Sequence, residues 1–325
     1  MNRLLFSIGI ILSGLSFGYI FQRLIEAGVI RLPIQTAATL RRRIQKISLQ
    51  FFAPVPIVGA VWLIRINDLR MAALPFLCVA TLFFGGFLAW AVGKVRGYGP
   101  KQIGALYCCG SFSNIASMGS LVSFFFIGED GFAMLALYKL FEEVTYYGIG
   151  FPVAKYYGIG LGESETFLRR LRKVFADPFV IVAMTALAAG LALNISGIPR
   201  PAFYETVSAV FIPLGVFLLL FTVGMGMSFE RMGYLREALL VSGIKFLAMP
   251  ALACIAASLL SMQTIYGGLP LKAVLLGSSM PVAFNSVVAS SLYELDLDLA
   301  NSCWLVTTGA MVIVLPCLYF LLEHI

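Results

Sequence analysis

The sequence predicts an all-helical membrane protein, and three features of its composition and pattern support this fold class. Of the 325 residues, 60% are hydrophobic and only 12% are charged, whereas soluble domains are usually about 25% charged. Long apolar runs recur along the chain, separated by short charged clusters. These runs lack the two-residue alternation of a transmembrane β-barrel. Since lipid offers the backbone no hydrogen bonds, each run is expected to cross the membrane as an α-helix.

The apolar runs define ten expected spans, most of them near the ~20 residues that cross about 30 Å of hydrocarbon. Their ranges are 4–22, 44–64, 71–93, 102–127, 131–154, 178–197, 202–226, 236–260, 272–293 and 299–322. No small-x-small cleavage motif follows the first run, so a retained span is expected there rather than a signal peptide. Spans four and nine stand out because they are rich in glycine, serine, asparagine or proline.

The basic residues predict the orientation of the spans. Sixteen of the 23 Lys and Arg residues fall in loops that follow odd-numbered spans, and five fall at the N-terminus or in the other loops. Because basic loops stay in the cytoplasm, both termini are expected on the extracytoplasmic side of a plasma or inner membrane. The net charge of +7 therefore reflects topology in membrane lipid, and no nucleic-acid partner is expected.

The two halves of the chain resemble each other at their most unusual segments. Shifting KQIGALYCCGSFSNIASMGSL by 171 residues places it on KAVLLGSSMPVAFNSVVASSL and aligns Asn114 with Asn285. Each half would hold five spans, an odd number, so the halves would enter the membrane in opposite directions. The sequence thus predicts two inverted five-helix repeats, 1–154 and 178–325, joined by a basic cytoplasmic loop at 155–177.

Interrupted spans at matching positions of inverted repeats are typical of secondary transporters. Pro281 has no N–H, and the small residues around Gly110 weaken the matching turn of the first half. The helix N-termini that such breaks expose suit an anionic ligand, and the amides of Asn114 and Asn285 can orient a carboxylate. A kink or an interhelical hydrogen bond is the alternative interpretation. The expected substrate site comprises Asn114, Asn285, Pro281, Gly110, Ser111, Ser113 and Ser286.

Charged residues within the spans form a second candidate group. Lys139, Glu142 and Glu143 lie in span five, and Lys245 lies in span eight. Lys139 precedes the two glutamates by three and four residues, so it can pair with either on one helix face. Intramembrane charges usually face the protein interior. These four residues are candidates for ion coupling, with Glu142 or Glu143 carrying a proton, and a structural pair that only neutralises charge is the open alternative.

The cysteines and the histidine indicate no metal or cofactor site. All six cysteines lie in apolar runs without zinc-type spacing, as is typical of small packing residues. The single histidine, His324, lies at the C-terminal end of the sequence. The HExxH motif is absent and no pair of aspartates lies within the expected spans, so no enzyme activity is expected. An intramembrane enzyme or a receptor without transport is the alternative from a different class.

Several segments resemble the auxin efflux carrier family of membrane transporters, which includes plant PIN carriers and bacterial permeases. IPLGVFLLLFTVGMGM, KFLAMP, MPVAFNSVVASSLYE and LANSCWLVTTGAMVIVLP are similar to the family's seventh to tenth spans. SFSNIASMGSLVSFFFIGEDGFAM is similar to its Asn-Gly segment in the first half. Gly110-Ser111 replaces a crossover proline of the PIN pattern, and no long loop separates the halves. These departures favour a compact bacterial-type permease over an auxin carrier.

The resemblance implies that helices four and nine are broken and cross at the substrate, with Asn114, Asn285 and Pro281 at the crossing. It also implies a scaffold of spans one, two, six and seven beside a transport domain of spans three to five and eight to ten. The implied function is secondary active transport of a small organic anion by elevator-type alternating access, as a permease or efflux carrier. The bile-acid/sodium symporter family shares this architecture, so a sodium-coupled symporter is the nearest alternative. The substrate, the transport direction, coupling to a proton or sodium, and assembly as a homodimer stay open.

Overall fold

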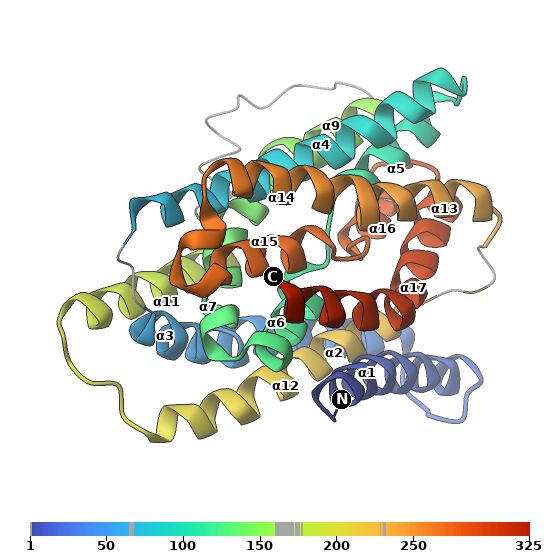
Figure 1. Cartoon of the computed structure of the whole chain (residues 1–325). Helices are drawn as coiled ribbons and strands as arrows, with labels where there is room; N and C mark the ends of the chain where they lie inside the picture. Colours follow the sequence, from blue (N-terminus) through green and yellow to red (C-terminus); the bar gives the residue numbers. More distant parts are fainter. Residues whose placement is uncertain are drawn as a thin grey trace. The chain divides into compact units, whose positions relative to one another are not determined.

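The described part of the chain is helical and forms no β-strand (Figure 1). The computed structural model describes residues 2–64, 68–159, 172, 176, 178–227, 229 and 232–325. Within these ranges, six helices are long and apolar enough to cross a membrane, and the helices Ile115–Ile127 and Val180–Ile195 are apolar but shorter. An all-helical, multi-pass membrane protein is therefore confirmed, whereas the ten spans and their inverted repetition stay predictions.

The chain divides into two compact units. Unit 1 comprises Met1–Arg65, Ser120–Ala133 and Pro178–Met227, and unit 2 comprises Ile66–Gly119, Met134–Asp177 and Ser228–Ile325. The helices of unit 1 are α1 (Asn2–Glu26), α2 (Ile34–Ile47), the π-helical turn η1 (Ser48–Phe52), α3 (Pro54–Leu63), α6 (Ser120–Ile127), the first half of α7 (Glu129–Tyr138), α11 (Pro178–Ile195) and α12 (Phe203–Gly224).

Unit 2 contains the remaining described helices. They are η2 (Leu69–Ala73), α4 (Leu74–Val95), α5 (Pro100–Ser111), η3 (Ile115–Gly119), the second half of α7, η4 (Lys139–Phe141), α8 (Glu142–Thr145), η5 (Tyr146–Gly150), α9 (Phe151–Tyr157), α13 (Leu235–Gly243), η7 (Ile244–Ala248), α14 (Met249–Leu259), η8 (Met262–Thr264), η9 (Tyr266–Gly268), α15 (Leu269–Ser278), α16 (Asn285–Leu292) and α17 (Leu297–His324). Most of the predicted connecting loop 155–177 lies outside the described residues.

The second helical segment begins earlier than the sequence analysis predicts. The expected span starts at residue 44, but α2, η1 and α3 follow one another as a helical rod from Ile34 to Leu63. The basic run Arg41–Arg43, expected in a loop, lies on α2. This stretch, IQTAATLRRRIQKI, is rich in alanine, leucine, arginine, glutamine and lysine, which are good helix formers, and this accounts for the extension.

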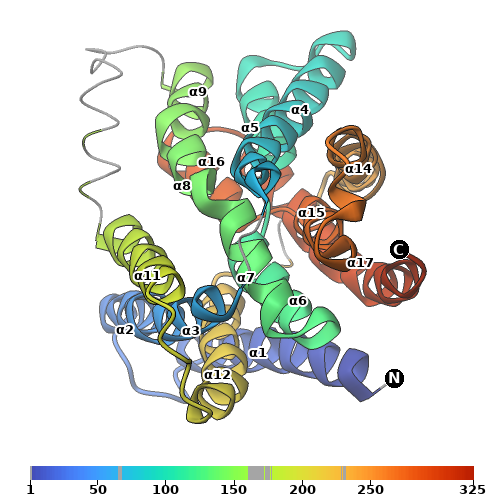
Figure 2. The same cartoon turned by 60° about the vertical axis from the view of Figure 1, so that its left-hand side comes forward.

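In unit 1, α1 packs against α12 through glycines (Figure 2). Gly14 and Gly18 are one helical turn apart on α1, and a Cβ atom at Gly18 would collide with the carbonyl of Phe221 on α12. In the same way, a Cβ atom at Gly224 on α12 would collide with the carbonyl of Leu15. This small-residue spacing lets two membrane helices approach closely, so dispersion contacts stabilise the pair.

Polar side chains satisfy exposed backbone groups at the ends of the unit 1 helices. The Nδ2 of Asn194 donates to the carbonyls of Val61 and Trp62, at 3.1 and 2.8 Å, where α3 ends.

Arg200 forms an ion pair with Glu129 at 2.7 Å, and both side chains are largely buried. Such pairing offsets the cost of burying the two charges, and it fixes the start of α7 to the segment before α12.

In unit 2, α4 and α5 lie side by side (Figure 1) and approach closely at two glycines. A Cβ atom at Gly85 would collide with the carbonyl of Gly110, and one at Gly110 would collide with the carbonyl of Gly85. Gly110, predicted to belong to the substrate site, is therefore placed in the helix interface. Its missing side chain sets the position of the last turn of α5 against α4.

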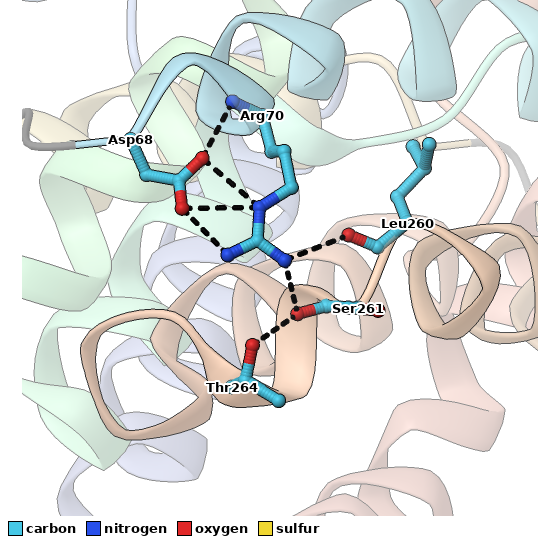
Figure 3. A network of polar contacts seen from close by, with 5 residues as sticks. All are labelled: Asp68, Arg70, Leu260, Ser261 and Thr264. Atoms are coloured by element: carbon cyan, nitrogen blue, oxygen red, sulfur yellow. Dashed lines mark hydrogen bonds and ion pairs between the residues drawn. The ribbon is translucent and has the colours of Figure 1, made fainter.

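A polar network joins the segment before α4 to the end of α14 (Figure 3). The guanidinium of Arg70 pairs with the carboxylate of Asp68 at 2.6 Å and donates to the carbonyls of Leu260 and Ser261, at 3.4 and 3.3 Å. A cation beside a helix C-terminus interacts favourably with the helix dipole. The hydrogen bond from Arg70 lowers the pKa of Asp68, although solvent screening keeps such exposed pairs weak.

The start of α17 is fixed by Asp296. Its Oδ1 accepts a hydrogen bond from the N–H of Leu299 at 2.9 Å, which caps the helix. Its Oδ2 accepts from the hydroxyl of Tyr234 at 2.8 Å, and this hydrogen bond raises the pKa of Tyr234. The carboxylate thereby ties the N-terminus of α17 to the residue before α13.

Candidate functional site

The first helix break of unit 2 follows α5. Helical hydrogen bonding ends at Ser111, and Phe112 has extended backbone angles (φ −79°, ψ 124°). Helical structure resumes at Ile115 with η3. The small and hydroxyl residues around this position have low helix propensity, so the sequence itself favours the break.

The second break of unit 2 separates α15 from α16. The helix α15 ends at Ser278, and α16 begins at Asn285. Pro281 lies within the intervening segment, where it cannot donate a helical hydrogen bond. Both breaks therefore lie where the sequence analysis predicts them.

The two interrupted segments pair with each other in antiparallel fashion. Ser113 and Val282 form an isolated β-bridge. The N–H of Asn114 donates to the carbonyl of Pro281 at 2.8 Å, and the N–H of Ala283 donates to the carbonyl of Phe112 at 3.1 Å. Each break therefore supplies hydrogen-bond partners for the other, which meets the requirement that buried backbone polar groups be satisfied. We call residues 112–114 with 281–283 the crossing.

Two side chains from other helices complete the hydrogen bonding of the crossing. The ammonium of Lys245, which is fully buried in the π-helical turn η7, donates to the carbonyl of Phe112 at 3.0 Å and to the Oγ of Ser113 at 2.8 Å. From α17, the Oγ1 of Thr307 accepts from the N–H of Val282 at 3.2 Å. Lys245 was predicted as an ion-coupling residue, and its described contacts are with the crossing.

Span five approaches the crossing through Tyr146. The hydroxyl of Tyr146 accepts from the N–H of Ser113 at 2.7 Å and lies 2.9 Å from the carbonyl oxygen of Ser113. It also lies 2.8 Å from the Oε1 of Glu142, one turn earlier. Glu142, Tyr146 and Ser113 are all buried. A buried carboxyl group is thus linked to the backbone of the crossing by a single phenol.

The sequence analysis allows Lys139 to pair with Glu142 or Glu143; within the described part of the chain Glu142 forms no ion pair with Lys139 and contacts Tyr146. Residues Lys139–Phe141 form a 3₁₀ turn, and α8 restarts at Glu142. This change of helical pitch alters the i, i+3 geometry on which the prediction depends.

The two asparagines lie at the starts of the helices that follow the breaks. The carbonyl of Asn114 accepts from the N–H of Gly119 at 3.2 Å, and its Oδ1 accepts from the hydroxyl of Ser117. Asn285 is the first residue of α16, is partly exposed, and its side chain makes no hydrogen bond to any described residue. Ser286 is buried and donates to the carbonyl of Ala283 at 2.8 Å. The amide donors and acceptor of Asn285 are therefore not engaged by the described part of the chain.

Comparison with known proteins indicates the functional class of this chain. No protein-family model matches the chain. A protein of Methanothermobacter thermautotrophicus named an uncharacterized transporter is 25% identical over 252 residues, which cover 77% of this chain and 78% of that protein. An uncharacterized transporter of Methanocaldococcus jannaschii is 24% identical over 257 residues, covering 76% and 77% of the two chains. These relatives support a membrane transporter rather than an enzyme.

Two residues of this site, Tyr146 and Thr307, are not among the candidates that the sequence predicts. Both donate or accept at the crossing through side chains on helices distant in sequence. Tyr146 follows Glu142 by four residues, so the helical period places the two on one face, and this spacing is the one signal that the sequence contains. Among the described residues, no three His, Cys, Asp or Glu side chains are grouped to hold a metal ion.

Proposed function

We propose that this protein is a secondary active transporter of a small organic anion, and that its cargo binds at the crossing. The observation that carries the proposal is the antiparallel pairing of two broken helices within one compact unit. Unwound backbone at membrane depth is tolerated where it lines a site, and it is a feature of transporter binding sites. The names of the two archaeal relatives support the class.

The chemistry of the crossing supports an anionic cargo. Helix α16 begins at Asn285, and the segment Ile115–Ile127 begins directly after Asn114. Helix N-termini carry partial positive charge, which favours a carboxylate or phosphate. The Nζ of Lys245 adds a hydrogen-bond donor beside Ser113. These features support an organic carboxylate as the cargo class.

We further propose an elevator-type mechanism, with unit 1 as the scaffold and unit 2 as the moving transport domain. Unit 1 contains the helices of expected spans one, two, six and seven together with Ser120–Ala133 from spans four and five, and unit 2 contains those of spans three, eight, nine and ten with the rest of spans four and five. All the candidate site residues belong to unit 2. The proposal also places the chain in the auxin efflux carrier family, with two inverted repeats and both termini extracytoplasmic.

Uptake by purified protein in proteoliposomes tests the proposed function. A panel of labelled organic carboxylates is offered under a proton gradient, a sodium gradient or a membrane potential. We expect one or more to accumulate, and we expect Asn114→Ala and Asn285→Ala each to lower uptake about ten- to a hundredfold, because each removes a hydrogen bond to a charged group. Gln263→Ala, which removes an exposed amide outside the crossing, is the matched control. Uptake that is unchanged in both asparagine variants would remove the proposed site.

A further inference from the structure

The hydroxyl of Tyr146 has three polar neighbours. The N–H of Ser113 donates to it at 2.7 Å, the carbonyl oxygen of Ser113 lies at 2.9 Å, and the Oε1 of Glu142 lies at 2.8 Å. The last two are oxygen–oxygen contacts, and each needs a hydrogen atom between the two oxygens. These groups are buried, so solvent does not relieve an unfavourable contact.

Counting hydrogens decides the protonation of Glu142. A phenol has one hydrogen to donate and two lone pairs that accept. If Glu142 were a carboxylate, the hydrogen of Tyr146 could serve either Glu142 or the carbonyl of Ser113, and the other contact would set two lone pairs against each other. If Glu142 carries a proton, it donates to Tyr146, and Tyr146 donates to the carbonyl of Ser113. All three contacts are then satisfied.

The charged and titratable groups around Glu142 come from several helices. Lys139 and Glu143 lie on its own span, Tyr138 lies on α7, Cys78 comes from α4 and Lys245 comes from η7. Two basic residues, Lys139 and Lys245, lie close enough to interact electrostatically with Glu142. The hydrogen bonds of Lys245 go to the crossing, and Glu142 forms no ion pair within the described part of the chain. A proton is therefore the positive charge that completes the contacts of this carboxyl group.

We propose that Glu142 is a proton-binding site that controls the crossing through Tyr146. This inference rests on the proposed function for its meaning in transport, but the site itself is defined by the geometry. When the proton leaves, Tyr146 turns its hydrogen toward the new carboxylate, and the carbonyl of Ser113 loses its donor. Residues 112–114 of the crossing then lose one of the hydrogen bonds that hold them in place. Binding of a proton at Glu142 and binding of cargo at the crossing are coupled in this way.

Infrared spectroscopy on the full-length protein in lipid tests the proton site without relying on transport. A protonated carboxylic acid has a carbonyl-stretch band separate from those of carboxylates and amides. We expect the wild-type protein to show this band at neutral pH, and Glu142→Gln to lose it. Glu129→Gln is the matched control, since it removes another little-exposed carboxyl group, one that forms an ion pair with Arg200 at 2.7 Å, and this variant should keep the band. Loss of the band in Glu143→Gln instead would overturn the assignment.

A second variant tests the link to the crossing. Tyr146→Phe keeps the ring that packs against Phe112 at a centroid distance of 4.4 Å and removes only the hydroxyl. The acid band should remain in this variant and shift to higher frequency, because the proton of Glu142 has lost its acceptor. An unshifted band would contradict the proposed chain of hydrogen bonds. This variant also keeps the proposal testable if Glu142→Gln does not fold.

The pH dependence of uptake separates this inference from the proposed function. Where a carboxylate is transported, Glu142→Gln should flatten the pH profile that the wild-type protein shows. An acid band that depends on Glu142, in a protein that transports no organic anion, would uphold the proton site and refute the proposed function. Transport of an organic anion with a wild-type pH profile in Glu142→Gln, in a protein without an acid band, would uphold the proposed function and refute the proton site.

Discussion

Replacing Lys245 by methionine is expected to lower uptake about ten- to a hundredfold while the protein still folds. The ammonium makes two hydrogen bonds to the crossing, at 3.0 and 2.8 Å, and a hydrogen bond to a charged group contributes about 1.5–3 kcal/mol. The carbonyl of Phe112 keeps its hydrogen bond from Ala283, but no other described group donates to the hydroxyl of Ser113. Since methionine fills a similar volume and needs no hydrogen bonds, the unfolding temperature should fall only slightly.

The matched control for this variant is Lys94→Met. Lys94 is exposed near the C-terminal end of α4, so its replacement also removes one positive charge without touching the crossing. Uptake and unfolding temperature are measured on both variants in the same preparation. If Lys245→Met transported as well as Lys94→Met, the ammonium would have no role in holding the site.

Replacing Gly18 by valine is expected to destabilise unit 1 strongly. The new side chain would collide with the backbone of Phe221 on α12, and backbone cannot move aside as a flexible side chain can. Overpacking usually costs about 1–3 kcal/mol, and a contact with backbone lies at the upper end of that range. Separating α1 from α12 also removes the close packing on which membrane helix pairs depend.

The same helix provides a control for the glycine variant. A Cβ atom at Gly9 would meet nothing within 4 Å, so Gly9→Val changes the helix propensity of α1 equally without a collision. Thermal unfolding in detergent, followed by size-exclusion chromatography, compares the two. Equal unfolding temperatures for Gly18→Val and Gly9→Val would show that α1 and α12 do not pack closely at Gly18.

The sequence predicts the two helix breaks because their causes are local. Proline lacks an N–H, and glycine and serine favour non-helical backbone, so Pro281 and the residues around Gly110 mark the positions directly. The contact between the two breaks, in contrast, does not have a local cause. Whether Asn114 lies opposite Pro281 depends on the packing of distant helices, and the spacing of residues along one chain does not specify it.

The sequence indicates which residues belong to the site better than it indicates what each residue contacts. Lys245 and Glu142 stand out in the sequence because charged residues inside membrane spans are costly. Their hydrogen-bond partners, Ser113 and Tyr146, are visible only in the three-dimensional structure. Gly110 was expected to weaken a turn, and the structure places it against Gly85 of α4. A glycine gives the same signal for flexibility and for close packing, so sequence alone does not separate the two.

Cysteine labelling at Asn285 tests most directly whether the crossing holds the cargo. In a protein whose six native cysteines are replaced, Asn285→Cys and Ser286→Cys are each treated with a water-soluble maleimide. Residue 285 is partly exposed and residue 286 is fully buried, so only the first should react. A transported carboxylate should slow its reaction when it is offered at about a hundred times the concentration that saturates wild-type uptake, because loss of the asparagine weakens binding. Labelling of Asn285→Cys at the same rate with and without that carboxylate would contradict a cargo site at the crossing.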